Sequence, residues 1–82
     1  MYYMGLSYYD KRKYDRSIVW YKRALEIPNT YHYKVQNSMG ISYDDLKKYD
    51  EAEECYKKCT ETAPKYHSAY YNLAIVHKAR GN

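Results

Sequence analysis

The stretch Gln36-Asn37-Ser38-Met39-Gly40-Ile41-Ser42-Tyr43 decides the fold, because it occurs nearly three times in this chain of 82 residues. Its glycine, Gly40, aligns with Gly5 at a distance of 35 residues and with Ala74 at a distance of 34. The other positions that align are Met4 with Met39 and Leu73, Tyr8 with Tyr43 and His77, and Tyr21 with Tyr56. A repeat of this length predicts an array of helical hairpins, each of which buries its apolar face on its neighbours.

The repeated unit resembles the tetratricopeptide repeat, whose signature is W-x2-L-G-x2-Y, then A-x3-F and then P. The second copy is Gln36-x2-Met39-Gly40-x2-Tyr43, Ala52-x3-Tyr56 and Pro64. The first copy is Met1-x2-Met4-Gly5-x2-Tyr8, Ser17-x3-Tyr21 and Pro28, and the third is Tyr70-x2-Leu73-Ala74-x2-His77. The resemblance implies an all-α fold, a right-handed superhelix of antiparallel helical hairpins. It covers the chain as one domain, with repeats over about 1–30 and 31–64 and a partial third repeat over about 65–82.

Apolar side chains at helical spacing predict five helices. The expected ranges are 2–10, 14–26, 33–46, 49–62, and from 65 or 66 to 80. Pro28 ends the second helix because its nitrogen has no hydrogen to donate, and Gly81 ends the fifth. The spacing after Pro28 is irregular, so we expect a longer turn there. The small residues expected where the two helices of a hairpin cross are Gly5, Ala24, Gly40, Ala52 and Ala74.

The composition describes an amphipathic chain, with 14 tyrosines, no phenylalanine and a mean hydropathy of -0.99. No apolar run approaches the roughly 18 residues that a membrane-spanning helix needs. The N-terminus also lacks the basic and apolar segments of a signal peptide. Cys55 and Cys59 are four residues apart in a predicted helix, which favours two reduced thiols over a disulfide or a zinc site. We therefore expect a soluble cytoplasmic protein that does not enter a membrane.

The net charge of +4 is concentrated at one end of the chain. Residues 1–34 contain seven basic and three acidic side chains, whereas residues 35–82 contain seven of each. The simplest interpretation is a solvated helix face. An acidic partner or a phosphate backbone would nevertheless be drawn to the first hairpin before the others.

No constellation of residues indicates catalysis. The glycines are isolated, so the chain has no glycine-rich phosphate loop, and His32, His67 and His77 have no Ser or Cys partner at a suitable spacing. His77 takes the place of a tyrosine in the repeat, which favours a structural histidine over a general base. We expect no enzymatic activity, no cofactor and no bound metal.

The resemblance implies a concave surface lined by the first helix of each hairpin, where related proteins hold short peptides. By alignment the groove residues are Tyr2, Leu6, Tyr9, Lys34, Asn37, Ile41, Asp44, Ser68, Tyr71, Asn72, Ile75 and Lys78. Tyr2, Tyr9 and Tyr71 suit peptide anchoring, because a tyrosine offers an apolar ring and a polar tip at low entropic cost. Asn37 and Asn72 suit pairing with the main chain of an extended peptide. The predicted function is a protein-interaction scaffold that presents this groove to a peptide or a partner-protein segment.

One specialised role within the family is not expected. Members that bind chaperone tails grip a C-terminal carboxylate with a cluster of basic and amide side chains. The matching positions here are Tyr2, Leu6, Ser38, Ser68 and Asn72, and they include no Lys or Arg. A carboxylate clamp for chaperone tails is therefore not predicted.

Other interpretations of the chain remain open at this point. The last predicted helix carries a stripe of Ala69, Leu73, Val76 and His77, which we expect to be exposed and to mediate homo-oligomer formation. The first alternative function is a helical repeat that binds single-stranded RNA, since the chain is basic and rich in aromatic residues. Nucleic acid is disfavoured because the basic residues gather at one end instead of lining the groove. The second alternative is a structural or engineered repeat array that self-associates.

Overall fold

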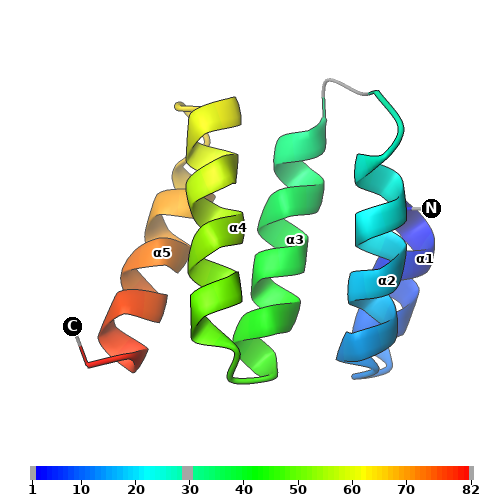
Figure 1. Ribbon diagram of the computed structural model, residues 1–82, viewed down its shortest axis with the longest axis horizontal. Helices are drawn as coiled ribbons and strands as arrows, with labels where there is room; N and C mark the ends of the chain where they lie inside the picture. The colour runs from blue at the N-terminus through cyan, green and yellow to red at the C-terminus, as the bar shows by residue number, and fades with distance from the viewer. Residues whose placement is uncertain (1, 29–30, 82) are drawn as a thin grey trace.

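A computed structural model describes residues 2–28 and 31–81, and within these ranges it contains five α-helices and no strand (Figure 1). The helices are α1 (Tyr2–Asp10), α2 (Tyr14–Leu25), α3 (His32–Asp45), α4 (Tyr49–Thr62) and α5 (His67–Ala79). Each helix packs against the next one in the chain, and α3 also contacts α1 and α5. The helices α1, α3 and α5 therefore form one layer, and α2 and α4 form the other. The predicted all-α array of helical hairpins is confirmed.

The helix boundaries agree with the predicted ranges to within two residues. The helix α2 ends at Leu25, slightly early, because Ile27 precedes Pro28 and a residue before proline avoids the helical conformation. The helix α5 begins after a turn in which the Tyr66 amide donates to the Ala63 carbonyl at 3.0 Å. The longer turn expected after Pro28 includes residues 29 and 30, which lie outside the described residues.

Each complete hairpin is closed by a tyrosine ring that lies directly on a glycine of the partner helix. A Cβ added to Gly40 would lie 2.5 Å from Cε1 and 2.8 Å from Cδ1 of Tyr56, and one added to Gly5 would meet the Tyr21 ring as closely. Both rings are 1% exposed, so neither can move aside into solvent. The repeat pattern predicted that the two helices of a hairpin cross closely at these glycines. The structure corrects the reason: an aromatic ring occupies the space that a side chain would need.

The third small position of the repeat has no such partner. Ala74 aligns with Gly5 and Gly40 but is exposed, because none of the described helices covers that side of α5. Of the two partner alanines, Ala52 is completely buried and Ala24 is half-buried beside the first core cluster. A small residue is therefore needed at this repeat position in the two complete hairpins, but not at Ala74.

The core consists of two clusters. The first joins α2, α3 and α4, and its buried members are Ile18, Tyr21, Val35, Met39 and Cys55. The second joins α4 and α5, and its buried members are Ala52, Tyr56 and Val76, with Ile41, Tyr43, Tyr49 and Leu73 packed against them. The apolar stripes of successive hairpins thus bury one another, as the repeat predicts.

Two positions that align with an alanine of the other repeat, Ser17 with Ala52 and Cys59 with Ala24, carry polar side chains with hydrogen-bond partners. Ser17 Oγ donates to the Tyr14 carbonyl at 2.7 Å, so it accepts the hydrogen of Ser42 Oγ, which lies 2.8 Å away. Both serines are completely buried. Cys59 Sγ donates to the Tyr33 carbonyl at 3.1 Å. Ser17 and Cys59 therefore each have a hydrogen-bond partner, and each adds a link to the neighbouring helix α3.

The turn inside each complete hairpin places a basic residue in the left-handed conformation. Arg12 has φ 61° and Lys47 has φ 64°, and the two residues align in the repeat. The amide of Lys13 donates to the Tyr8 carbonyl at 2.8 Å, which is the Schellman bond that closes α1. The amide of Lys48 donates to the Tyr43 carbonyl at 2.8 Å and closes α3 in the same way. Glycine is the residue that usually occupies this position, so Arg12 and Lys47 give no signal of the motif in the sequence.

The ring-on-glycine contact generates a stability prediction. We expect Gly40→Ala to lower the free energy of unfolding by about 1–3 kcal/mol, because the new methyl group overlaps a fully buried ring. The matched control is Ala74→Leu, which enlarges the aligned but exposed position and should stay within about 0.5 kcal/mol of the parent chain. Urea unfolding followed by circular dichroism measures both changes. An unchanged midpoint for Gly40→Ala would contradict the packing described above.

Candidate protein-interaction groove

The layer of α1, α3 and α5 carries the residues predicted to line a groove, and we call its surface the groove face. The Tyr2 hydroxyl on α1 lies 3.0 Å from Oγ of Ser38 on α3, within hydrogen-bond distance. On the next step of the array, Asn72 Nδ2 on α5 donates to Asn37 Oδ1 on α3 at 2.9 Å. Tyr2 aligns with Asn37 and Ser38 aligns with Asn72, so the same link occurs twice. The first helices of the hairpins are therefore tied together by side chains on the groove face.

The predicted groove residues divide into a packed group and an exposed group. The packed group, half-buried or buried, is Tyr2, Leu6, Tyr9, Asn37, Ile41, Asp44 and Asn72. The exposed group is Lys34, Ser68, Tyr71, Ile75 and Lys78. Asn37 and Asn72, expected to bind a peptide main chain, bond each other instead. The exposed part of the groove face comes mainly from α5, where Tyr71 is 70% and Ile75 is 41% exposed.

The half-buried groove residues near the end of α3 have shifted pKa values. Burial and a hydrogen bond to Asp45 raise the pKa of Tyr9 to about 12, and its ring lies 5.5 Å from the Tyr14 ring. Burial and the neighbouring Asp45 carboxylate raise the pKa of Asp44. Tyr9 thus connects α1 to α2 and to the end of α3. Its role is structural, which leaves Tyr71 as the most exposed of the three tyrosines predicted to be anchors.

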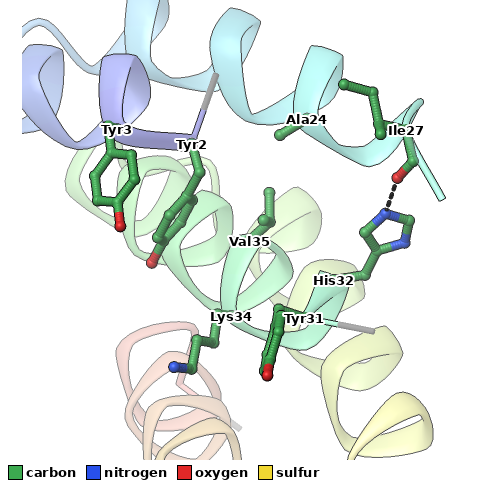
Figure 2. A pocket seen from close by; sticks show the side chains of 8 residues that line it. All are labelled: Tyr2, Tyr3, Ala24, Ile27, Tyr31, His32, Lys34 and Val35. Atoms are coloured by element: carbon green, nitrogen blue, oxygen red, sulfur yellow. Dashed lines mark hydrogen bonds between the residues drawn. The ribbon is translucent and has the colours of Figure 1, made fainter. Parts of the chain in front are cut away.

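A hollow of about 600 Å³ opens beside the turn between the first two hairpins (Figure 2). Its walls are Tyr2, Tyr3, Ala24, Ile27, Tyr31, His32, Lys34 and Val35. Figure 2 shows the rings of Tyr2 and Tyr3 approaching from α1 toward Lys34 on α3. His32 Nε2 donates to the Ile27 carbonyl at 2.6 Å and holds the two sides of the turn together. The groove alignment found only Tyr2 and Lys34 of this set, because the other walls come from α2, the turn and residues outside the aligned positions.

The predicted self-association stripe on α5 was assigned to the wrong face. Ala69 and Val76 are completely buried within the chain, and Leu73 is half-buried against Ala52 and Tyr56 of α4. The reason is register: Ala69 and Val76 align with Val35 and Ser42, which face the preceding hairpin. The exposed face of α5 carries Tyr70, Tyr71, Ala74 and Ile75 instead. Self-association itself stays a prediction, with these residues in place of the original ones.

His77, the fourth member of that stripe, is half-buried beside an ionic cluster. Its Nε2 lies 3.9 Å from Oε1 of Glu53, which also pairs with Lys57 at 2.9 Å. Arg80 contacts Glu53 and lies 2.9 Å from Asp50. These pairs fasten the end of α5 to α4, and because most of the groups are exposed they add little stability each.

Comparison with known protein families agrees with this geometry. One segment of the chain, residues 1–31, and a second, residues 33–66, match sequence models described as tetratricopeptide repeat. The chain belongs to the tetratricopeptide repeat family. Tetratricopeptide repeats are generally protein-interaction modules and form a non-catalytic scaffold family. A search of curated proteins finds no match to this chain.

The two thiols of this tetratricopeptide repeat chain are poor nucleophiles. Burial raises the pKa of Cys55 to about 11, and burial likewise raises the pKa of Cys59 to about 11. At neutral pH both are therefore protonated. Within residues 2–28 and 31–81, no group of three or more His, Cys, Asp and Glu side chains is arranged to hold a metal ion. No helix in that part of the chain is long and apolar enough to cross a membrane.

The raised thiol pKa values predict a loss of stability at alkaline pH. In the unfolded chain the thiols ionise near their ordinary pKa of 9.0, whereas in the folded chain they hold their protons to about 11. Between these values the folded state binds more protons, so the free energy of unfolding falls as the pH rises. Below pH 9 both states are protonated and the contribution is fully present.

Thermal melts at about pH 8 and about pH 10.5 measure this effect. We expect a lower Tm at the higher pH and a smaller decrease for Cys59→Ala, which introduces the residue found at the aligned position, Ala24. The exposed substitution Glu61→Ala is the control and should leave the decrease unchanged. Equal decreases for the parent chain and Cys59→Ala would show that the thiol does not contribute.

Proposed function

We propose that this chain is a protein-interaction scaffold that holds an extended or helical segment of a partner protein across the groove face. Its membership of a family of protein-interaction modules supports this function in general terms. The exposed residues of the groove face support it more specifically, because they combine an aromatic ring, an aliphatic side chain and two lysines. Such mixed surfaces suit a peptide that has both apolar and polar groups.

The observation that carries the proposal is the exposure of the Tyr71 side chain to solvent. Tyr71 aligns with Tyr2 and Asn37, and each of those residues bonds the next helix of the groove face. At the third step the tyrosine is 70% exposed, with the exposed Ile75 one turn further along α5. A partner segment lying beside α5 would bond the Tyr71 hydroxyl and cover both side chains, as α3 and α5 do at the earlier steps.

The structure offers no support for a carboxylate clamp on this face. Of the positions that match the clamp, Ser38 bonds the Tyr2 hydroxyl and Asn72 bonds Asn37. Leu6 is packed against the first core cluster, and no Lys or Arg stands at any of these positions. The proposed ligand is therefore recognised through side-chain contacts along the helices rather than through a chain terminus.

Binding of single-stranded RNA is the competing function, and salt separates the two. Among the predicted groove residues, the exposed cations are Lys34 on α3 and Lys78 on α5, and α3 also carries the half-buried Asp44. So few phosphate contacts do not form a continuous basic track. RNA held by phosphates would lose affinity steeply between about 50 and 200 mM salt, whereas a peptide held by Tyr71 and Ile75 would not.

The test begins with selection of binding peptides from a random display library against the whole chain. One selected peptide is then titrated into the isotopically labelled chain and followed by NMR. We expect shift changes at Ile41, Tyr71 and Ile75, and we expect Tyr71→Ala to raise Kd about tenfold, as for an aromatic anchor. The control Val19→Ala removes an exposed side chain from α2 and should leave Kd unchanged.

Two results would contradict this proposal. The first is the absence of any selected peptide that binds the chain reproducibly. The second is a set of shift changes confined to the outer surfaces of α2 and α4, around Lys22 and Lys58, with no effect of Tyr71→Ala.

A further inference from the structure

We propose that the hollow beside the turn between the first two hairpins is a side-chain pocket that takes a bulky apolar residue from an acidic partner segment. This inference rests on the proposed function, because it specifies the kind of peptide that the groove face would hold. It assigns a ligand to a site whose walls come largely from outside the aligned groove positions.

The size and lining of the hollow indicate an apolar occupant. Its volume of about 600 Å³ falls in the range typical of pockets that bind small ligands, and it has room for a bulky side chain with its adjoining main chain. Three of its wall residues are aromatic or aliphatic and yet largely exposed to solvent: Tyr3 is 79%, Tyr31 is 59% and Ile27 is 47% exposed. Covering these side chains would remove a substantial apolar area from water.

Two polar groups of the walls are already hydrogen-bonded inside the chain. The Tyr2 hydroxyl bonds Ser38 Oγ at 3.0 Å, and the His32 ring donates to the Ile27 carbonyl at 2.6 Å. An apolar group entering between them therefore displaces no protein hydrogen bond. The rest of the lining is mainly aliphatic and aromatic, and burying a polar group against such walls costs free energy, so the pocket favours an apolar side chain.

The charge at the mouth of the hollow indicates an acidic neighbour. The Lys34 ammonium lies 5.5 Å from the centre of the Tyr31 ring, and no carboxylate of the described residues lies within 4.0 Å of it. The segment that builds most of the pocket, residues 1–34, carries a net charge of +4. A carboxylate beside the apolar residue would pair with Lys34 without entering the apolar interior.

Two substitutions test the two parts of this inference separately. Ile27→Asp places a carboxylate on an exposed wall of the pocket, where it opposes both an apolar residue and an acidic neighbour. Lys34→Glu reverses the charge at the mouth and leaves the apolar walls intact. The matched controls are Val19→Asp on the outer surface of α2 and Lys65→Glu in the turn before α5, both at exposed positions outside the hollow.

The experiment repeats the random-peptide selection with the parent chain and all four variants, and measures Kd for a synthetic copy of one peptide enriched on the parent. We expect enriched peptides to carry Asp or Glu next to Leu, Met, Phe or Trp. Ile27→Asp should raise Kd at least about tenfold, as for loss of an anchor. Lys34→Glu should shift the selection away from acidic peptides, and both controls should behave like the parent. Circular dichroism confirms that each variant is folded.

The possible failures are distinguishable. If peptides bind reproducibly but are not acidic and apolar, or if Ile27→Asp and Lys34→Glu match their controls, the pocket is not the anchoring site and the groove proposal stands. If no peptide binds the parent chain, both the groove proposal and the pocket assignment are overturned.

Discussion

The fold depends on one steric constraint, the seating of a buried tyrosine ring on a glycine. Tyr21 covers Gly5 in the first hairpin and Tyr56 covers Gly40 in the second, at distances that leave no space for a Cβ. This contact sets how closely the two helices of a hairpin approach. It thereby sets where α1 and α3 lie in the layer that forms the groove face. In α5 the aligned residue Ala74 has no such ring over it among the described residues, and this side of the helix is exposed.

Polar atoms inside the core link the hairpins that the rings hold closed. The Tyr2 hydroxyl lies 3.0 Å from Ser38 Oγ and joins α1 to α3, a hydrogen bond that a phenylalanine at position 2 could not make. Burial raises the pKa of Tyr21 and of Tyr56, which keeps both phenols protonated at neutral pH. The buried Ser17 and Ser42 pair adds a similar link between α2 and α3. Tyr2 thus contributes a hydrogen bond between helices as well as an aromatic ring.

The repeat period and its small and aromatic positions were enough to predict the family and the helix boundaries, because both follow from local spacing. Features that depend on what lies across an interface were not predictable in this way. The stripe of Ala69 and Val76 was assigned to the wrong side of α5, since apolar spacing alone does not say which neighbour a face meets. Asn37 and Asn72 were expected to face a ligand and instead bond each other. The hollow was missed because its walls converge from three elements.

The rings on the glycines position the groove face, which is the surface proposed to meet a partner protein. The most direct test is an NMR measurement of the glycine Hα protons in the unaltered chain. We predict NOEs from Gly5 to the Tyr21 ring and from Gly40 to the Tyr56 ring, with ring-current shifts absent at the unobstructed Gly81. Gly5 and Gly40 protons at the same positions as those of Gly81, without ring NOEs, would contradict the hairpin geometry and the groove face built on it.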